Sequence, residues 1–178
     1  MFIEAYGAGE IVRLATARGF IVASPRTEQV SDAAAFAALL AAIKRDYTVD
    51  EDRIYVLGHS MGAMATAAIA TREASRIAAA ACIAGGFNAA PKSTPAPTLV
   101  IGAELDSIVG PARLKKVAEA AAAAGQPVSY EAVTGYGHTL VVEHSLPRAL
   151  EFLFAHKRGE AAAHKPADDA MPVAPAAK

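Results

Sequence analysis

Residues 58–62 read Gly-His-Ser-Met-Gly and include the hydroxyl that a hydrolytic nucleophile needs. They follow the apolar run 54–57 and precede the small, helix-forming residues 63–70. Between a strand and a helix, the Gly-x-Ser-x-Gly pattern forces the serine into a sharp turn that exposes its hydroxyl. We therefore expect Ser60 to be a nucleophile and the N–H of Met61 to face a developing oxyanion. The competing interpretation is a glycine-rich turn of an ordinary βα unit.

The neighbours of Ser60 have expected roles as well. Strand and helix pass close together at such a turn, so the residues two before and two after the serine must be small. Gly58 and Gly62 meet that requirement. His59 lies inside the turn, and we expect it to shape the pocket rather than to act as a base.

An acid and a base follow two later predicted strands. Asp106 comes after the apolar run 98–101, and His138 comes after the alternating run 128–133. A serine hydroxyl needs a general base, which a neutral imidazole provides, and a carboxylate on the far ring nitrogen fixes the tautomer. The carboxyl ends of parallel strands share one edge of the sheet, so these side chains are predicted to meet Ser60 there.

Each assignment has competitors in the sequence. Glu104 could be the acid in place of Asp106. His144 and His156 lie near or within the last predicted helix rather than after a strand, and His164 lies further along the chain. No His-Glu-x-x-His or similar spacing occurs, so neither a metal nor a cofactor is expected.

Helical and strand patterns alternate along the chain and predict an α/β fold. The hydrophobic spacing predicts helices over residues 9–18, from Ser31, from Pro111 and from Pro147, and strands over residues 20–23, 54–57, 76–83, 98–101 and 128–133. Ser31 is expected to cap the second helix, which buries Phe36, Leu39, Leu40 and Ile43. This alternation indicates a mostly parallel sheet with helices on both faces.

Composition excludes several classes of protein. The chain has 178 residues, of which 53% are hydrophobic and 20% charged, and a net charge of −1 without a basic stripe, which argues against a nucleic-acid partner. No apolar run is long enough for a membrane span, and the first residues lack the pattern of a signal peptide, so the cytoplasm is the default location. Cys82 is expected to be buried. Residues 1–157 are predicted to form the domain, and the Ala- and Pro-rich residues 158–178 a disordered tail.

With these residues in place, the chain resembles the α/β-hydrolase family over about residues 8–156. The resemblance is carried by residues 58–62, 102–106 and 137–139. The run 52–60 is similar to small esterases of the dienelactone hydrolase, polyhydroxybutyrate depolymerase and prolyl-oligopeptidase-like groups. The chain order of serine, aspartate and histidine is also the order that this family uses.

The resemblance implies a serine hydrolase of short-chain carboxylic esters that forms an acyl-enzyme. Ser60 would be the nucleophile, Asp106 the acid, His138 the base and Met61 N–H one oxyanion donor. The expected pocket walls are His59, Met61, Phe87, Ile108 and Leu140. The alternatives are a thioesterase or peptidase on the same residues, a non-catalytic truncated hydrolase that binds a ligand, and a flavodoxin-like binding domain.

Two departures from the family pattern shape further expectations. The family places a strand and a His-Gly-rich loop, which supplies a second oxyanion donor, before its first helix. No His-Gly pair precedes residues 9–18, so the chain is expected to be short at its N-terminus, with a homodimer through the exposed strand edge as one remedy. If a second donor exists, we expect it from residues 24–30. The short loop between residues 83 and 98 leaves no room for a lipase-like lid, which predicts an open site.

Overall fold

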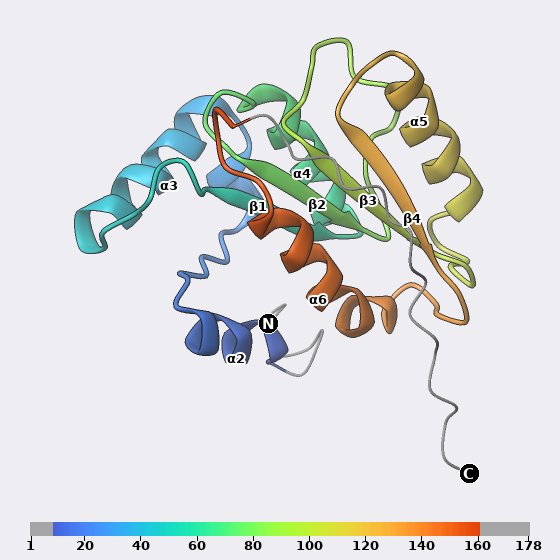
Figure 1. Cartoon of the computed structure of the whole chain (residues 1–178), viewed down its shortest axis with the longest axis horizontal. Helices are drawn as coiled ribbons and strands as arrows, with labels where there is room; N and C mark the ends of the chain where they lie inside the picture. Colours follow the sequence, from blue (N-terminus) through green and yellow to red (C-terminus); the bar gives the residue numbers. More distant parts are fainter. Residues whose placement is uncertain (1–8, 161–178) are drawn as a thin grey trace.

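The strands form one parallel sheet in the computed structural model, which describes residues 9–160 (Figure 1). The four strands are β1 (Tyr55–His59), β2 (Ala79–Ile83), β3 (Thr98–Ala103) and β4 (Val128–Val133), in the order β1-β2-β3-β4. Every neighbouring pair is parallel. All four strands therefore present their carboxyl ends at one edge, as the sequence predicted.

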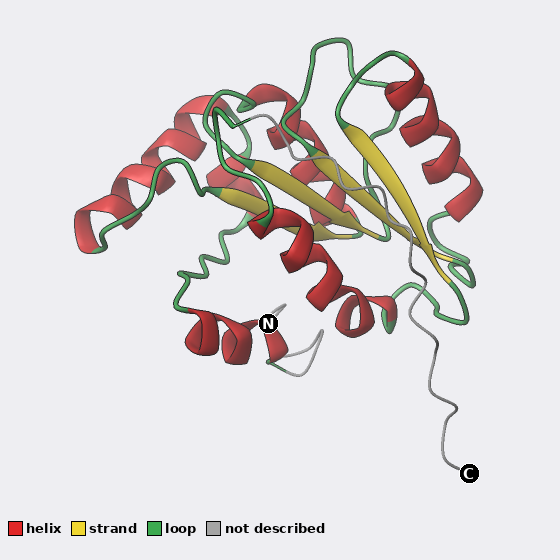
Figure 2. Cartoon of the chain, viewed as in Figure 1, coloured by secondary structure: helices red, strands yellow, loops and turns green. Residues whose placement is uncertain are grey.

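Helices connect the strands and cover the sheet (Figure 2). They are α2 (Glu10–Arg18), the 3₁₀ helix η1 (Thr27–Val30), α3 (Ala33–Asp46), α4 (Met61–Arg72), α5 (Pro111–Ala123) and α6 (Val141–Phe154). Helix α6 covers one face of the sheet and α4 and α5 the other (Figure 1). The predicted α/β fold with helices on both faces is confirmed.

The two central strands supply the core to both helical layers. Leu99 and Ile101 of β3 pack in the cluster that includes Leu146 of α6, whereas Val100 packs with Leu114 of α5. Side chains of successive strand residues point to opposite faces, so one buried strand serves two layers. Every residue of β2 and β3 is buried, as expected for parallel strands with helices on both sides.

Residues 20–23 are not a strand, contrary to the expectation from their sequence. They carry no strand assignment, and β1 is the terminal strand of the sheet in the part of the chain that is described. An isolated extended segment has no ladder of hydrogen bonds to stabilise it. Phe20 packs instead edge-on against Phe154 of α6, with the ring centroids 5.2 Å apart.

Helix α3 starts and packs differently from the prediction. Its N-cap is Asp32, whose carboxylate accepts the Ala35 N–H at 2.8 Å, rather than Ser31. Ser31 has helical dihedrals and ends η1, so it cannot adopt the extended backbone of a cap. Of the predicted apolar face only Phe36 is buried; Leu39, Leu40 and Ile43 are half-buried.

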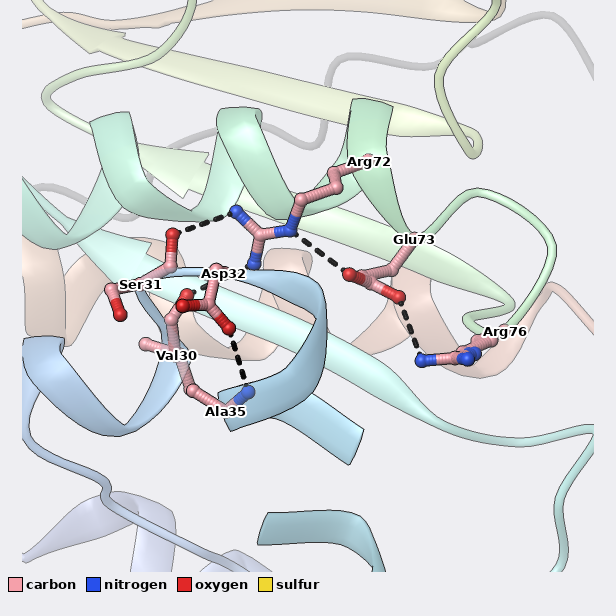
Figure 3. A network of polar contacts seen from close by, with 7 residues as sticks. All are labelled: Val30, Ser31, Asp32, Ala35, Arg72, Glu73 and Arg76. Carbon is pink, nitrogen blue, oxygen red and sulfur yellow. Dashed lines mark hydrogen bonds and ion pairs between the residues drawn. The ribbon is translucent and has the colours of Figure 1, made fainter. Parts of the chain in front are cut away.

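A polar network fastens the start of α3 to the end of α4 (Figure 3). The Arg72 guanidinium donates to the backbone carbonyls of Val30 and Ser31 at 3.0 and 3.1 Å, and to Glu73 at 2.9 Å. Glu73 is buried and accepts a further bond from Arg76. This network therefore holds η1 at the end of α4 that is remote from Ser60.

Helix α6 begins at Val141, six residues before the predicted start at Pro147. Its buried stripe runs through Val142, Leu146, Ala149 and Leu153, so the apolar face continues across the proline. A proline inside a helix costs about 3 kcal/mol because it removes one hydrogen bond and crowds the preceding turn. Burial of this stripe offsets that cost, and the exposed Pro147 ring lies on the solvent side.

The structure tests two expectations about the whole chain only in part, because it describes residues 9–160. The predicted tail falls mainly on residues 161–178, outside the described range, and the domain boundary stays a prediction. No helix within residues 9–160 has the length and apolarity of a membrane span.

Candidate active site

Ser60 sits at the turn between β1 and α4 in a rare backbone conformation. Its φ of 55° and ψ of −118° lie outside the helical and strand regions. Such a conformation costs about 1–3 kcal/mol and persists only where the surroundings hold it. Here the Ser60 N–H donates to the Ile83 carbonyl at 2.9 Å, and the Ser60 carbonyl accepts from Ala63 and Met64. The peptide groups before and after the Ser60 Cα are thus both fixed.

Two glycines make room for this turn, and only one of them was predicted. A Cβ on Gly58 would overlap the carbonyl of Gly62, and a Cβ on Gly85 would lie 2.8 Å from the Ala63 Cβ and against the Ser60 carbonyl. A Cβ on Gly62 would meet nothing within 4 Å, so the close approach does not require glycine at that position. The need for Gly85 arises in the loop that follows the neighbouring strand β2 and has no signal in the motif.

Ser60, His138 and Asp106 lie in hydrogen-bond contact at the carboxyl edge of the sheet. His138 Nε2 is 2.8 Å from Ser60 Oγ, and His138 Nδ1 is 2.8 Å from Asp106 Oδ2. An ionised carboxylate can only accept, so Nδ1 carries the proton and Nε2 accepts from the serine hydroxyl. The His138 side chain is 13% exposed and that of Asp106 is fully buried. The arrangement can remove a proton from Ser60.

Buried Asp106 is kept in its charged form by hydrogen bonds. Burial by itself raises the pKa of Asp106, but the bonds from His138 and from the N–H groups of Val109 and Ile108 outweigh it and hold the pKa below its ordinary value. The backbone bonds occupy Oδ1 and leave Oδ2 for the imidazole. The loop after β3 therefore orients the carboxylate as well as carrying it.

Glu104, the alternative acid, has another partner. Its carboxylate accepts the N–H of Gly135 at 2.9 Å, and the neighbouring Leu105 N–H donates to the Tyr136 carbonyl at the same distance. Glu104 is exposed and braces the loop that carries His138. The geometry thus favours Asp106 as the partner of the imidazole.

The other described histidines contact other groups, and one of them, His59, contacts the backbone of His138. His144 stacks on Tyr136, with ring centroids 4.5 Å apart, and His156 Nδ1 bonds to the Phe152 carbonyl. His59 Nε2 lies 2.8 Å from the backbone carbonyl of His138. His164 lies outside the described residues.

The expected pocket walls separate into exposed and buried residues. Met61 is 71% exposed, and Ile108 and Leu140 are each 72% exposed, on the loops and helix start that carry the three reactive side chains. Phe87 is 8% exposed and packs in the core cluster of α4 and α5. This placement favours a core role for Phe87 and leaves the other three free to contact a ligand.

The predicted oxyanion donor, the Met61 N–H, lies at the start of a helix. Met61 opens α4, where the first N–H groups of a helix have no partner inside it. Val30 and Ser31 lie at the far end of α4, because Arg72 binds their carbonyls. Eleven residue steps of helix separate Met61 from Arg72, a distance of about 16 Å. The end of the 24–30 loop is therefore not beside Ser60, and a second donor from this loop stays a prediction.

Other reactive chemistry is limited in the described residues. Cys82 is fully buried in β2, and burial raises the pKa of its thiol to about 12, so it is not a competing nucleophile. No group of three or more His, Cys, Asp or Glu side chains within residues 9–160 is arranged to hold a metal ion.

The chain is similar to known proteins in sequence and in fold. A family model described as PET hydrolase-like matches residues 8–119, which is more than half of the chain. A thermostable esterase of known structure is 25% identical with a TM-score of 0.59; the match covers 70% of this chain and 36% of the esterase. Esterase PE8 is 21% identical with a TM-score of 0.57, and 67% of it is covered. No curated protein matches the sequence.

A further structure matches over more of the chain. A candidate α/β-hydrolase of unknown function from Agrobacterium tumefaciens has a TM-score of 0.62 at 17% identity, and the match covers 85% of this chain and 77% of that protein. The fold is therefore that of the α/β-hydrolases. The chain spans about a third of the thermostable esterase and two thirds of esterase PE8.

Proposed function

The chain belongs to the PET hydrolase-like family, and on this premise we propose that it is a serine hydrolase that cleaves carboxylic esters through an acyl-enzyme on Ser60. The observation that carries the proposal is the pair of 2.8 Å contacts that link Ser60 to His138 and His138 to Asp106. The family description and the esterases of similar fold support an ester as the bond that is cleaved.

The proposed reaction follows from the roles of the three side chains. Ser60 Oγ attacks the carbonyl carbon while His138 Nε2 takes its proton, and buried Asp106 stabilises the imidazolium. The Met61 N–H donates to the oxyanion of the tetrahedral intermediate. His138 then gives the proton to the departing alcohol oxygen, which leaves the acyl group on Ser60. Attack of water, with His138 again as the base, releases the acid.

Labelling with a fluorophosphonate probe, followed by mass spectrometry, tests the proposal. The probe should react at Ser60 and not with Ser60→Ala. Ser107→Ala, at an exposed loop position, is a matched control that should label like the wild type. Labelling that persists in Ser60→Ala would remove the nucleophile from the proposal. A folded wild-type chain that neither labels nor hydrolyses esters would instead indicate a ligand-binding domain.

We further propose a preference for short acyl groups, of about four carbons or fewer. The loop between β2 and β3 contains no helix that could form a lid, and Met61, Ile108 and Leu140 are exposed to solvent. Each buried methylene contributes about 0.8 kcal/mol, which an open site gains only in small part. A series of p-nitrophenyl esters measures this. Values of kcat/KM that rise steadily out to ten carbons would contradict it.

A further inference from the structure

His59 ends the strand at one edge of the described sheet and contacts a residue that follows the strand at the other edge. It is the last residue of β1, whereas His138 lies on the loop after β4. Three strand spacings separate these edge strands, a distance of about 14 Å. The loop after β4 must therefore reach across the ends of β2 and β3 to bring His138 to Ser60. The contacts that His138 makes after this crossing therefore determine the position of its imidazole.

His59 hydrogen-bonds to the backbone of His138 and packs against its ring. His59 Nε2 lies 2.8 Å from the His138 carbonyl oxygen, and the two rings pack at a centroid distance of 4.8 Å. A carbonyl oxygen only accepts, so His59 Nε2 is the donor. The bonds from His138 to Ser60 and Asp106 involve ring nitrogens whose protonation changes in the proposed reaction. The bond from His59 does not depend on that change.

We propose that His59 is a positioning residue that holds the backbone of His138 and so keeps its imidazole within reach of Ser60 in both protonation states. This inference rests on the proposed function, since it assigns His59 to the base of that reaction. Burial lowers the pKa of His59, and a neutral ring beside His138 avoids repulsion of the imidazolium. His59 thereby acts on the backbone of the base, His138, rather than on the substrate.

Two variants at this position separate a positioning role from pocket lining. His59→Leu keeps the bulk and removes the donor, whereas His59→Gln keeps an N–H donor at a similar reach. We expect His59→Leu to lower kcat about tenfold, the effect of one lost hydrogen bond, with KM within twofold of the wild type, and His59→Gln to recover most of kcat. Equal activity of Leu and wild type, or no recovery with Gln, would overturn the proposal, as would a change confined to KM.

A control distinguishes local positioning from a general loosening of the loop. Glu104→Ala removes a bond to Gly135, in the same loop but three residues before His138. Its kcat should fall less than that of His59→Leu, even if the two variants lose similar thermal stability. An equal loss of kcat in both variants would attribute the effect to the loop as a whole and overturn the role of His59.

An NMR measurement decides the question independently of turnover. The proton on His138 Nδ1 should exchange with water slowly in the wild type, faster in His59→Leu, and at close to the wild-type rate in His59→Gln. Unchanged exchange in His59→Leu would overturn the proposal even in an active enzyme. If no ester is hydrolysed and no probe reacts, the proposed function fails, and the exchange rates still decide whether His59 positions the His138 ring.

Discussion

The central strands of the sheet are packed more completely than its β1 edge and the helices that precede β1. Strands β2 and β3 are buried at every residue, whereas β1 is half-buried along most of its length. Helices α2 and α3 bury one residue each, Leu14 and Phe36, while α6 buries seven. The difference shows that a strand is buried by its neighbours and not by its own composition, since β1 is as apolar as β3 through Leu57.

The proposed acid and base come from strands beyond β1, of which β3 is buried throughout and the edge strand β4 at one residue only. Asp106 and His138 follow β3 and β4, and Ser60 is anchored to β2 through the Ile83 carbonyl. From the less buried side, β1 contributes the approach to Ser60 and the His59 contact. Mutations at the proposed reactive residues should therefore remove activity, whereas mutations in the helices before β1 should loosen those helices.

The largest effect is expected from Asp106→Asn, with a loss of kcat of about 10⁴-fold. An asparagine oxygen can still accept from Ile108 and Val109, but its amide would donate to His138 Nδ1. The imidazole proton then moves to Nε2, which can no longer accept from Ser60. Steady-state hydrolysis of a short ester measures this. Glu104→Gln is the matched control and should stay near the wild type; the reverse result would make Glu104 the acid.

Truncation of one leucine on each side of the comparison should differ in effect on stability. Leu99→Ala, in fully buried β3, should lower the free energy of unfolding by about 2–5 kcal/mol, because it leaves a cavity. Leu39→Ala, at a half-buried position of α3, should cost about 1 kcal/mol or less. Denaturant unfolding of both variants provides the values. Similar losses would mean that α3 is packed as tightly as the central sheet.

Removal of the Arg72 side chain should loosen η1 and α3 without affecting the central strands. The variant Arg72→Ala loses the bonds to the Val30 and Ser31 carbonyls and one partner of buried Glu73, an expected cost of about 1–3 kcal/mol. Hydrogen exchange should rise in α3 and stay unchanged in β3. Arg76→Ala, which removes only the other partner of Glu73, is the control. Faster exchange throughout the sheet would show that the two sides unfold together.

A smaller effect concerns acid stability. The folded-state pKa of Asp106 is lowered, so its contribution is complete above its unfolded-state pKa of about 3.9 and is lost as pH falls through the lower folded value. The stability difference between wild type and Asp106→Asn should therefore be constant near neutral pH and shrink below about pH 4. Thermal unfolding from pH 7 to pH 3 measures it. A difference that stays constant to pH 3 would contradict the sign.

A half-buried surface carboxylate before β1 provides the contrast. Glu10 in α2 also has a lowered pKa, caused first by its hydrogen bond from Arg13, but water screens this pair. Glu10→Gln should therefore leave unfolding at neutral pH without a measurable change. A clear loss of stability would show that α2 is held by charge as well as by Leu14.

Local residue patterns determined the strand–turn–helix around Ser60, the four strands of the sheet and the placement of Asp106 and His138 after two of them. These features are predictable because side-chain period, turn residues and chain order are properties of contiguous sequence, and because parallel strands end at a common edge. The same reasoning placed a strand at residues 20–23 and a cap at Ser31, and there it failed. A strand needs a neighbour, and a cap needs an extended backbone, which η1 denies to Ser31.

Only the tertiary structure decided which residues distant in sequence contact the Ser60 turn and the loop of His138. The sequence motif does not contain Gly85, which makes room for the Ser60 turn from the loop after the adjacent strand β2. It does not separate Asp106 from Glu104, which point to different partners in the same pair of loops. Nor does it show that His59, next to the serine in sequence, bonds to a carbonyl 79 positions later. Such contacts depend on how the loops cross the edge of the sheet, and the order of the residues along the chain does not record that.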